Sequence, residues 1–270
     1  MKLDLESNKT GFQERPVLRH RGSSATRTTD SVIEEVPVAL VINGISHAVM
    51  MVTPRDLQPF AMGFALTEGL VAKSSDIFDI EVREHARSFE IDITIATEDF
   101  VQLKQQRRSM AGRSGCGVCG IESLELLDLQ PERIDAAPLH AEGALQPAIA
   151  IAASQLGQHQ QLMRATGGVH AAAWCDAQGN VLRVCEDVGR HNALDKLIGY
   201  LALDGVDMQL GFIFMSSRAS YELVRKAARM NIPMLATISA PTTLAINIAR
   251  EAGMALASFC RRDGFVEYTA

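Results

Sequence analysis

Residues 210–259, LGFIFMSSRASYELVRKAARMNIPMLATISAPTTLAINIAREAGMALASF, decide the fold class of this chain. Short apolar runs alternate here with stretches of helical periodicity. The apolar runs are 210–215, 234–238 and 254–259, and the helical stretches are 221–230 and 243–252. Strands that alternate with helices of this length indicate helices packed on a largely parallel sheet. The stretch therefore predicts an α/β fold.

The residues upstream extend the same pattern. A predicted helix at 147–163 leads to two apolar strands, 169–175 and 181–185, which a turn at 176–180 separates. A further helix is predicted at 192–203. The second half of the chain is therefore expected to form one unit of packed helices and strands, without an internal repeat.

The first half is predicted to be β-rich. Asn43-Gly44 lies between two apolar runs, Val38–Ile42 and Ile45–Val52, an arrangement typical of a tight hairpin. Phe89–Ile95 alternates apolar with polar residues, as a half-buried strand does.

One helix is expected between these strands. Thr53-Pro54 offers an N-cap and a proline at the first helical position. Phe60 and Phe64 give this helix an apolar stripe, and Gly69 is expected to end it.

The remaining segments are expected to lack regular structure. Residues 1–31 are rich in Ser, Thr, Gly and Arg and show no sustained periodicity, which predicts a flexible arm. Gln105–Arg108 and four glycines predict an exposed, locally basic loop. The expected domains are a flexible N-terminal arm at 1–31, a small β-rich domain at 32–110, a mobile Cys-x-x-Cys loop at 111–120 and an α/β domain at 121–270.

Composition narrows the function classes. A net charge of −6 gives no electrostatic case for nucleic acid, although it leaves room for a local basic pocket. No apolar run approaches the ~18 residues that a membrane span needs. The polar N-terminus lacks the apolar stretch of a secretory signal. The odd count of five cysteines suggests a reducing compartment. We expect a soluble, cytoplasmic protein.

Chemical reactivity is expected at Arg113–Gly120, RSGCGVCG, which holds Cys116 and Cys119. A thiolate is the nucleophilic form of cysteine, and neighbouring cations such as Arg113 lower the pKa of the thiol. The glycines allow a bulky partner to approach the backbone. Two other roles remain open at this point. A structural zinc site would need further ligands, and a thioredoxin-like redox site normally opens the first helix of a compact βαβ unit.

Two further stretches combine glycine with titratable side chains. His170 follows a glycine pair beside a predicted strand, and it is either a core histidine or a ligand or proton donor. Glu186–Lys196, EDVGRHNALDK, marks a strand-to-helix junction. The carboxyl ends of strands bind ligands in open α/β sheets, so this junction is either a pocket wall or a helix cap.

Hydroxyl groups and arginines follow the other predicted strands. Ser216-Ser-Arg218 and Ser239–Thr243 precede helices, where they suit a phosphate group or a simple N-cap. Arg261 and Arg262 follow the last long strand and are able to clamp phosphate, and Asp263 is able to accept from a guanine edge. A solvated charge cluster is the alternative there. Glu186–Lys196, Ser216–Arg218 and Ser239–Thr243 make three strand-to-helix junctions in register, which favours an anionic ligand over three independent caps.

These motifs, in this order, resemble the FdhD/NarQ family, the sulfur carrier proteins required for formate dehydrogenase activity. The resemblance runs from about Glu35 to the C-terminus. It rests on Gly63–Gly69 (GFALTEG), Gly115–Gly120 (GCGVCG), Thr166–His170 (TGGVH), Glu186–Lys196, Ser216–Arg218 and Ser239–Thr242 (SAPT).

The resemblance implies a specific reaction. A cysteine desulfurase would pass persulfide sulfur to Cys116, with Cys119 as the second thiol. The carrier would then transfer sulfur to the Mo-bis(molybdopterin guanine dinucleotide) cofactor, bound as substrate, before its insertion into formate dehydrogenase. The cofactor-binding residues would be Phe259, Cys260, Arg261, Arg262, Asp263 and Gly264, a site that a guanine nucleotide also fits. No permanent metal, nucleic acid or membrane is implied.

The resemblance also implies an architecture. The fold class would be α/β, or α+β when the whole chain is considered. A small β-rich N-terminal domain would be paired with a three-layer α/β/α domain like that of cytidine deaminase. The resemblance also implies that the chain forms a homodimer.

Two other functions remain as alternatives. A zinc nucleobase deaminase needs His-x-Glu and a downstream Pro-Cys-x-x-Cys. His170 is instead followed by Ala171-Ala172, and the Cys-x-x-Cys lies upstream of it. The second alternative is a guanine-nucleotide-binding or pterin-binding chaperone without sulfur transfer. Cys175, Cys185 and Cys260 are expected to pack as small hydrophobic residues.

Overall fold

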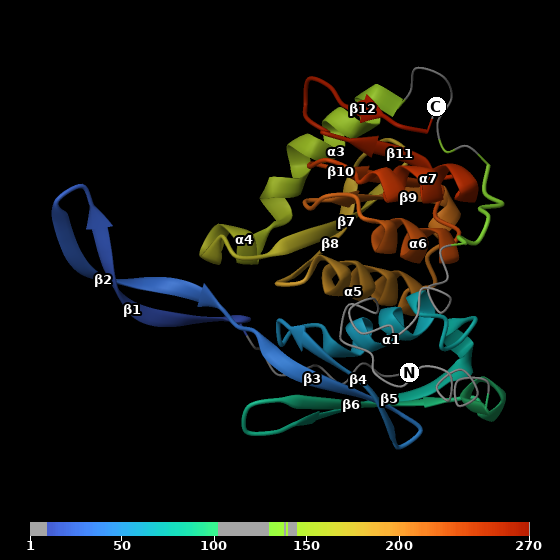
Figure 1. The fold of residues 1–270 in the computed structure, drawn as a ribbon, viewed down its shortest axis with the longest axis horizontal. Coiled ribbons are helices and arrows are strands. Elements are labelled where there is room, and N and C mark those ends of the chain that lie inside the picture. The colour runs from blue at the N-terminus through green and yellow to red at the C-terminus, as the bar shows by residue number, and fades with distance from the viewer. Residues whose placement is uncertain (1–9, 102–129, 138, 140–144, 270) are drawn as a thin grey trace.

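The structure is a computed structural model that describes residues 10–101, 130–137, 139 and 145–269 (Figure 1). It contains a six-stranded sheet, a four-stranded sheet and a two-stranded hairpin. The strands are β1 (Phe12–Arg21), β2 (Ser24–Ile33), β3 (Val36–Ile42), β4 (Ile45–Val52), β5 (Ile77–Glu84), β6 (Phe89–Ile95), β7 (His170–Asp176), β8 (Val181–Asp187), β9 (Gly211–Met215), β10 (Met234–Thr237), β11 (Ala255–Ser258) and β12 (Val266–Glu267). The α-helices are α1 (Leu57–Thr67), α3 (Leu145–His159), α4 (Gln161–Thr166), α5 (Arg190–Leu203), α6 (Tyr221–Arg229) and α7 (Thr243–Ala252), and 3-10 turns occur at Ser74–Asp76 and Met208–Leu210.

The six-stranded sheet has the order β12-β11-β10-β9-β7-β8. Its central strands β9, β10 and β11 are parallel, whereas β7 runs antiparallel to both β8 and β9. The parallel pairing of these three strands confirms the prediction that was made from the alternation over 210–259. The hairpin of β7 and β8 turns at Asp176, whose carboxylate accepts from the backbone amides of Gln178 and Asn180.

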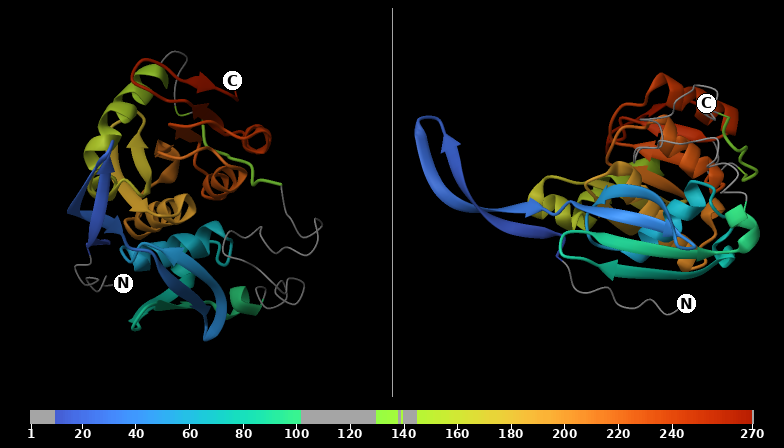
Figure 2. Two further views of the ribbon diagram at one scale, coloured as in Figure 1. Left: turned by 60° about the vertical axis from the view of Figure 1, so that its left-hand side comes forward. Right: turned by 60° about the horizontal axis from the view of Figure 1, so that its bottom comes forward.

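Helices cover both faces of this sheet. On one face, Ile149, Ala152 and Leu156 of α3 pack against inward residues such as Phe212 and Phe214. On the other face, α5, α6 and α7 bury the larger cluster that includes Trp174. The arrangement gives the three α/β/α layers that were predicted for the second half (Figures 1 and 2).

The four-stranded sheet has the order β4-β3-β6-β5 and buries one face against α1. Asn43 and Gly44 have φ values of 46° and 76°, so the predicted tight hairpin between β3 and β4 is confirmed. Helix α1 ends one residue before Glu68, and Gly69 takes the left-handed conformation with φ 69°, as predicted.

The start of α1 differs from the prediction. The helix begins at Leu57 after Asp56, so Thr53 is not its N-cap. Thr53 is instead fully buried, and its backbone amide donates to Asp187 Oδ2 at 2.9 Å. Its side-chain oxygen accepts from the backbone amide of Val188 at 3.2 Å. Contacts with a residue 134 positions away thus displace the local capping role that the sequence favoured.

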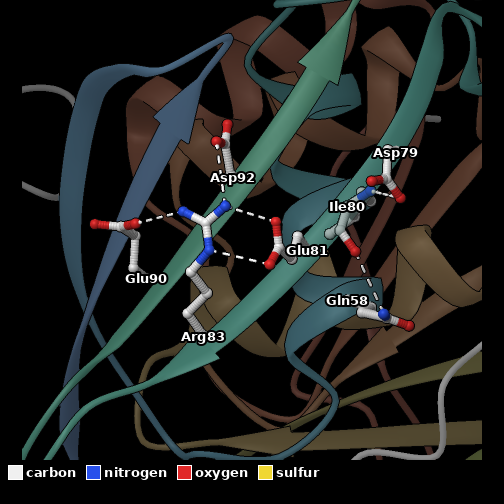
Figure 3. Close-up of polar contacts among 7 residues, drawn as sticks. All are labelled: Gln58, Asp79, Ile80, Glu81, Arg83, Glu90 and Asp92. Carbon is white, nitrogen blue, oxygen red and sulfur yellow. Dashed lines mark hydrogen bonds and ion pairs between the residues drawn. The ribbon is translucent and has the colours of Figure 1, made fainter.

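The outer face of the four-stranded sheet is polar along β5 and β6 (Figure 3). Arg83 donates to Glu81 and to Glu90 at 3.0 Å, and its guanidinium also lies 4.0 Å from Asp92. The nearby carboxylates raise the pKa of Arg83, with Glu81 the largest contributor. These ion pairs are exposed, so they contribute little stability and mark a solvated face.

Helices α1 and α5 join the two larger sheets. A Cβ atom added at Gly63 would overlap the carbonyl oxygen of Asp195, and one added at Gly199 would overlap the carbonyl oxygen of Pro59. The two backbones therefore touch at this crossing, which requires glycine on both helices.

A buried polar network reinforces that joint. Lys196 Nζ lies 2.7 Å from Asp187 Oδ2 and donates to the carbonyl of Thr53, and both ionic side chains are fully buried. Asn192 bridges Asp187 and the carbonyl of Met51. Each buried charge thus has an opposite charge and hydrogen bonds, which burial of charges demands.

A second buried cation lies on α6. Lys226 Nζ contacts both carboxylate oxygens of Asp195 at 2.9 Å, Glu68 at 2.8 Å and the hydroxyl of Thr67. Burial alone would lower the pKa of Lys226, but the two carboxylates outweigh it and raise the pKa. The lysine therefore stays charged and holds α1, α5 and α6 together.

The N-terminal region forms regular structure. Strands β1 and β2 pair antiparallel from Phe12↔Ile33 to Arg21↔Ser24, and the hairpin extends away from the rest of the protein (Figures 1 and 2). The expected absence of regular structure over 1–31 is therefore wrong from Phe12 onward. Almost all of its side chains are exposed, so the strands lack the apolar alternation that reveals half-buried strands.

Within the described ranges, no helix has both the length and the apolar character needed to cross a membrane.

Candidate functional site

Polar side chains gather at one edge of the six-stranded sheet. The parallel strands β9, β10 and β11 end there, because Met215 pairs with Thr237 and Ala236 with Ala257. Strand β7 begins and β8 ends at the same edge, since His170 pairs with Asp187. The sequence-predicted junctions after β8, β9, β10 and β11 therefore do lie along one edge, as their register suggested. We refer to it as the carboxyl edge.

The segment Phe259–Gly264 follows β11 at the carboxyl edge. Phe259 is exposed at 44% and adopts a left-handed φ of 56°, which is uncommon for a non-glycine residue. Its backbone amide donates to the carbonyl of Ser239 in the loop after β10. The backbone of Phe259 is therefore strained, and its exposed aromatic ring is available as a stacking surface at the sheet edge.

The charged residues of this segment differ in their contacts. The guanidinium of Arg261 donates to the carbonyls of Ile238 and Cys260 at 2.6 and 2.8 Å. Arg262 and Asp263 are exposed. Arg261 thus fixes the turn against the β10 loop, while its exposed neighbours face solvent.

Cys260 itself packs into the core. It is fully buried in the cluster below α3, and burial raises the pKa of its thiol to about 11. Cys260 therefore offers a ligand only its backbone. Its packing agrees with the expectation of a small hydrophobic residue.

The hydroxyl groups after β9 and β10 mostly form hydrogen bonds with backbone groups. Ser216 Oγ accepts from the amide of Ala171, and Ser217 Oγ donates to the carbonyl of Arg218. Thr242 caps α7 by accepting from the amide of Ala245 at 3.2 Å. These contacts favour the capping interpretation for Thr242 and leave the exposed Arg218 as a charge for binding.

The stretch Glu186–Lys196 divides into two parts. Its buried residues have structural roles. Asp187, Asn192 and Lys196 form the polar network beside Thr53. Glu186 accepts hydrogen bonds from the backbone amides of Leu162 and Met163. Neither a pocket wall nor a cap of α5 describes these residues, because α5 follows Gly189 without a side-chain cap. Arg190 and His191 are only partly buried and lie at the carboxyl edge.

Three titratable residues meet beside β7. His170 is partly buried, and burial together with the charges of Arg190 and His191 lowers its pKa. A histidine with a lowered pKa is neutral at neutral pH and is able to accept a hydrogen bond. His170 therefore belongs to the carboxyl edge rather than to the core.

Two residues of this edge escaped the sequence analysis. Glu222 lies in the first turn of α6, and its carboxylate is 3.8 Å from His191 Nε2. Burial alone would raise the pKa of Glu222, but hydrogen bonds with the side chains of His191 and Ser220 outweigh it and bring the pKa to about 2. Ser220 immediately precedes α6 and is 9% exposed. Serine before a helix and glutamate in its first turn are ordinary capping signals, so nothing in the sequence distinguished them.

The predicted reactive thiols, Cys116 and Cys119, lie outside the described residues. The thiols inside the described ranges are free and buried. Burial raises the pKa of Cys185 to about 12 and raises that of Cys175 as well. Such thiols are poor nucleophiles near neutral pH.

A zinc-deaminase site was the alternative from another class. His191 lies in the first turn of α5 but is followed by Asn192 and Ala193, so His-x-Glu is absent here as it is at His170. The loop before α6 has the spacing of Cys-x-x-Cys with serines, Ser217 and Ser220, in place of cysteines. The part of the chain that the structure describes holds no group of three His, Cys, Asp or Glu residues placed to hold a metal ion.

Comparison with known proteins decides the family. The model of the FdhD/NarQ family matches residues 33–270. This chain belongs to the FdhD/NarQ family. Among the FdhD/NarQ relatives, the "Sulfur carrier protein FdhD" of Chromobacterium violaceum is 60% identical over 269 residues and covers 99% of this chain and 98% of its own length. The protein of the same name from Burkholderia mallei is 56% identical over 272 residues, with 99% of each chain covered.

A solved structure supports the same FdhD/NarQ fold. The crystal structure of a putative formate dehydrogenase accessory protein from Desulfotalea psychrophila matches with a TM-score of 0.71 and covers 96% of this chain and 97% of that one. Its 21% sequence identity makes it evidence for the fold alone.

Proposed function

We propose that this protein is a sulfur carrier in the maturation of formate dehydrogenase. The observation that carries the proposal is the family match over residues 33–270, together with a relative named sulfur carrier protein at 60% identity across 99% of this chain. The sequence also supplies the chemistry, because the GCGVCG motif has the thiol pair that a carrier needs.

The first chemical step loads the carrier. The thiolate of Cys116 attacks the outer sulfur of a persulfide on a cysteine desulfurase, the sulfur–sulfur bond of the donor breaks, and the donor cysteine leaves as a thiolate. Cys116 then carries the persulfide, with no net oxidation. The buried thiols Cys175, Cys185 and Cys260 support this assignment because their raised pKa values disfavour nucleophilic attack.

The second step releases sulfur. The thiolate of Cys119 attacks the inner sulfur of the Cys116 persulfide, which forms a Cys116–Cys119 disulfide and expels hydrosulfide. The two electrons that reduce the transferred sulfur come from the two cysteine thiols, and a cellular dithiol then reduces the disulfide.

The sulfur acceptor is the Mo-bis(molybdopterin guanine dinucleotide) cofactor, bound as substrate at Phe259–Gly264. Three features support this placement. Phe259 offers an exposed ring for stacking on a base. Asp263 is an exposed acceptor for a guanine edge, and Arg262 is an exposed cation for phosphate. Formate dehydrogenase is the client, and we propose that the carrier acts as a cytoplasmic homodimer.

A persulfide measurement tests the carrier function. Purified protein is incubated with a cysteine desulfurase and cysteine and then analysed by intact-protein mass spectrometry. Wild type should gain the mass of one sulfur atom, and Cys116→Ala should not. Cys185→Ala is the matched control and should load like wild type, because Cys185 is buried. Failure of wild type to load sulfur would refute the carrier function.

A second measurement separates the thiols from the cofactor site. Guanine nucleotide binding should survive Cys116→Ala and disappear with Arg261→Ala, which releases the turn from the carbonyl of Ile238. Arg262→Ala removes an exposed cation without breaking that turn and should weaken binding by a smaller factor. Equal binding by all three variants would place the nucleotide elsewhere.

A further inference from the structure

The β1–β2 hairpin extends away from both larger sheets (Figures 1 and 2). Each of its strands has 10 residues. Most of its side chains are exposed, including the apolar Leu18 at 54% and Val32 at 43%. An isolated two-stranded hairpin is only marginally stable in water, so a regular hairpin of this length indicates a partner that covers it.

One face of this hairpin is basic. Every second residue of a strand lies on the same face of the sheet, and residues paired across the ladder share that face. Arg15, Arg19 and Arg21 of β1 therefore lie on one face, with Val17 between them. Asp30, opposite Arg15, is on the same face and pairs with Arg19 at 3.3 Å. The face keeps a net positive charge, and we call it the basic arm face.

The outer face of the four-stranded sheet has the opposite charge (Figure 3). Strands β5 and β6 place three carboxylates, those of Glu81, Glu90 and Asp92, around the guanidinium of Arg83, which leaves a net negative charge. Within the described residues, Asp92 Oδ1 is buried without a hydrogen-bond partner, and Oδ2 lies 4.0 Å from Arg83. A buried acceptor without a donor is costly, so Asp92 favours an incoming cationic donor.

Apolar side chains lie beside the charges on both surfaces. Val49 of β4 pairs with Ala39 of β3, and Ala39 pairs with Glu90 of β6, so these residues share the outer face. Val49 is exposed at 56% and Met51 at 47%, whereas α1 packs on the opposite face of the sheet. We call this outer surface the acidic sheet face. It presents carboxylates beside apolar groups, as the basic arm face presents arginines beside Val17.

The dimensions of the two surfaces match. Strands of 10 residues at about 3.3 Å per residue give an arm about 33 Å long, whereas strands about 4.8 Å apart make the four-stranded sheet about 15–20 Å wide. One arm is therefore long enough to cross the whole acidic sheet face. An arm about 10 Å wide covers about 330 Å². Two reciprocal contacts would bury about 1,300 Å² in total, which lies within the range of stable interfaces.

We propose that the basic arm face of one copy binds the acidic sheet face of a second copy, so that two copies exchange arms in a closed homodimer. The exchange is reciprocal, because a two-fold axis repeats every contact and leaves neither surface free for a third chain. Pairing of one arm with the other arm is disfavoured, since it would place arginines opposite each other. The inference rests on the proposed function and deepens it by naming the surfaces that join the homodimer.

Charge reversal tests the two surfaces. Arg19→Glu/Arg21→Glu reverses the arm, and Glu81→Arg/Glu90→Arg reverses the sheet. Each double variant alone should raise the dissociation constant of the dimer by about a hundredfold or more, because like charges then face each other. Sedimentation velocity of the full chain over a range of concentrations measures this constant.

A matched control separates the arm from net charge. Arg133→Glu/Arg250→Glu makes the same change in charge as the arm variant. Arg250 lies in the last turn of α7, and the amide that follows Arg133 donates to the carbonyl of Ala252 at the end of that helix. This variant should keep the dissociation constant of wild type.

A mixture of the two reversed variants gives the sharpest test. The reversed arm of one chain then meets the reversed sheet of the other, and the unchanged arm meets the unchanged sheet. Both contacts of a mixed dimer are therefore complementary, although each variant alone has two repelling contacts. Native mass spectrometry should show monomers for each variant alone and heterodimers in the mixture, which also shows that both variants are folded.

Three results would overturn the arm exchange. They are a folded wild type that is monomeric at every concentration, a dissociation constant that the reversals leave unchanged, and a mixture that stays monomeric while circular dichroism shows both variants folded. Persulfide loading of Cys116 distinguishes the exchange from the carrier function. A monomeric wild type that gains sulfur refutes the exchange and keeps the carrier. A dimer that responds to the reversals as expected but gains no sulfur refutes the carrier and keeps the exchange.

Discussion

At the scale of single residues, environment separates side chains of the same type. Glu81 and Glu222 both lie near a basic side chain, but Glu81 is exposed on the outer sheet face whereas Glu222 is partly buried against His191. The pKa of Glu222 falls to about 2 because hydrogen bonds with His191 and Ser220 outweigh the cost of burying the carboxylate. A partly buried carboxylate with a shifted pKa links the stability of the fold to pH.

The low pKa of Glu222 predicts a defined pH window. Because its folded-state pKa lies below the unfolded value, the carboxylate stabilises the fold above pH 4.5, and this stabilisation is lost as pH falls toward 2. Glu222→Gln should therefore have a lower urea midpoint than wild type at pH 7, and the difference should shrink below pH 4.5 and vanish as pH approaches 2. Glu251→Gln, an exposed change at the end of α7, is the control. A difference between wild type and Glu222→Gln that stays constant with pH would contradict the prediction.

Burial also predicts which thiols stay inert. In a Cys116→Ala/Cys119→Ala double variant, iodoacetamide at pH 8 should leave the three remaining cysteines unmodified. The raised pKa values of Cys185 and Cys260, about 12 and 11, leave only about one thiolate in a thousand or fewer. Mass spectrometry should show full modification in urea. Stoichiometric modification of the native variant would show that these thiols are accessible.

At the scale of elements, the glycines of α1 and α5 determine how closely the two helices approach. Gly63 and Gly199 allow direct backbone contact, and the buried ion pair of Asp187 and Lys196 lies in the same joint. In contrast, Gly157 in α3 has open space where a Cβ atom would lie. The same residue type is therefore essential in one helix and dispensable in another.

Alanine substitutions should separate these two cases. Gly63→Ala and Gly199→Ala should each destabilise the protein by about 3 kcal/mol or more, because the added methyl group forces the helices apart. Gly157→Ala should instead stabilise it by about 0.5–1 kcal/mol through better helix propensity. Urea unfolding checks all three, and a neutral Gly63→Ala would disprove the close crossing.

The sequence predicted those elements whose own residues carry a local signal. The alternation over 210–259, the Asn43-Gly44 hairpin and the end of α1 at Gly69 were confirmed because period, turn chemistry and positive φ are local properties. Strand β5, Ile77–Glu84, was missed because its exposed charged residues obscure the apolar alternation.

The candidate site was less predictable. The alignment of junctions at one edge followed from the strand pattern, but the burial of Asp187 and Lys196 depends on their contacts with Thr53, more than 130 positions away. Ser220 and Glu222 carried ordinary helix-cap signals. Tertiary contacts, which no local pattern encodes, decided their roles.

At the scale of the whole molecule, we expect the two larger sheets to unfold as one cooperative unit. Trp174 is the single tryptophan and lies in the core of the six-stranded sheet, so its fluorescence reports on that half, whereas circular dichroism reports on both. Because α1, α5 and the buried ion pairs connect the halves, both signals should give the same urea midpoint in wild type. Separate midpoints would show that the halves unfold independently.

Breaking the central ion pair should lower this common midpoint. Lys196→Met leaves the carboxylate of Asp187 buried without its cation and should cost about 3–5 kcal/mol. The double variant Asp187→Asn/Lys196→Met should lose less, since no uncompensated charge remains. Lys73→Met, which removes an exposed pair with Asp76, should change stability by less than about 1 kcal/mol. A Lys196→Met variant as stable as Lys73→Met would refute the role of the buried pair.

The long sequence separation within that joint also bears on synthesis at the ribosome. Thr53 hydrogen-bonds through its amide to Asp187, a residue translated 134 codons later. At about 5–20 residues per second, this interval lasts about 7–27 s, during which the nascent four-stranded sheet exposes the face of α1 that later contacts α5. The face of α1 around Gly63 therefore stays without its α5 partner until α5 leaves the exit tunnel.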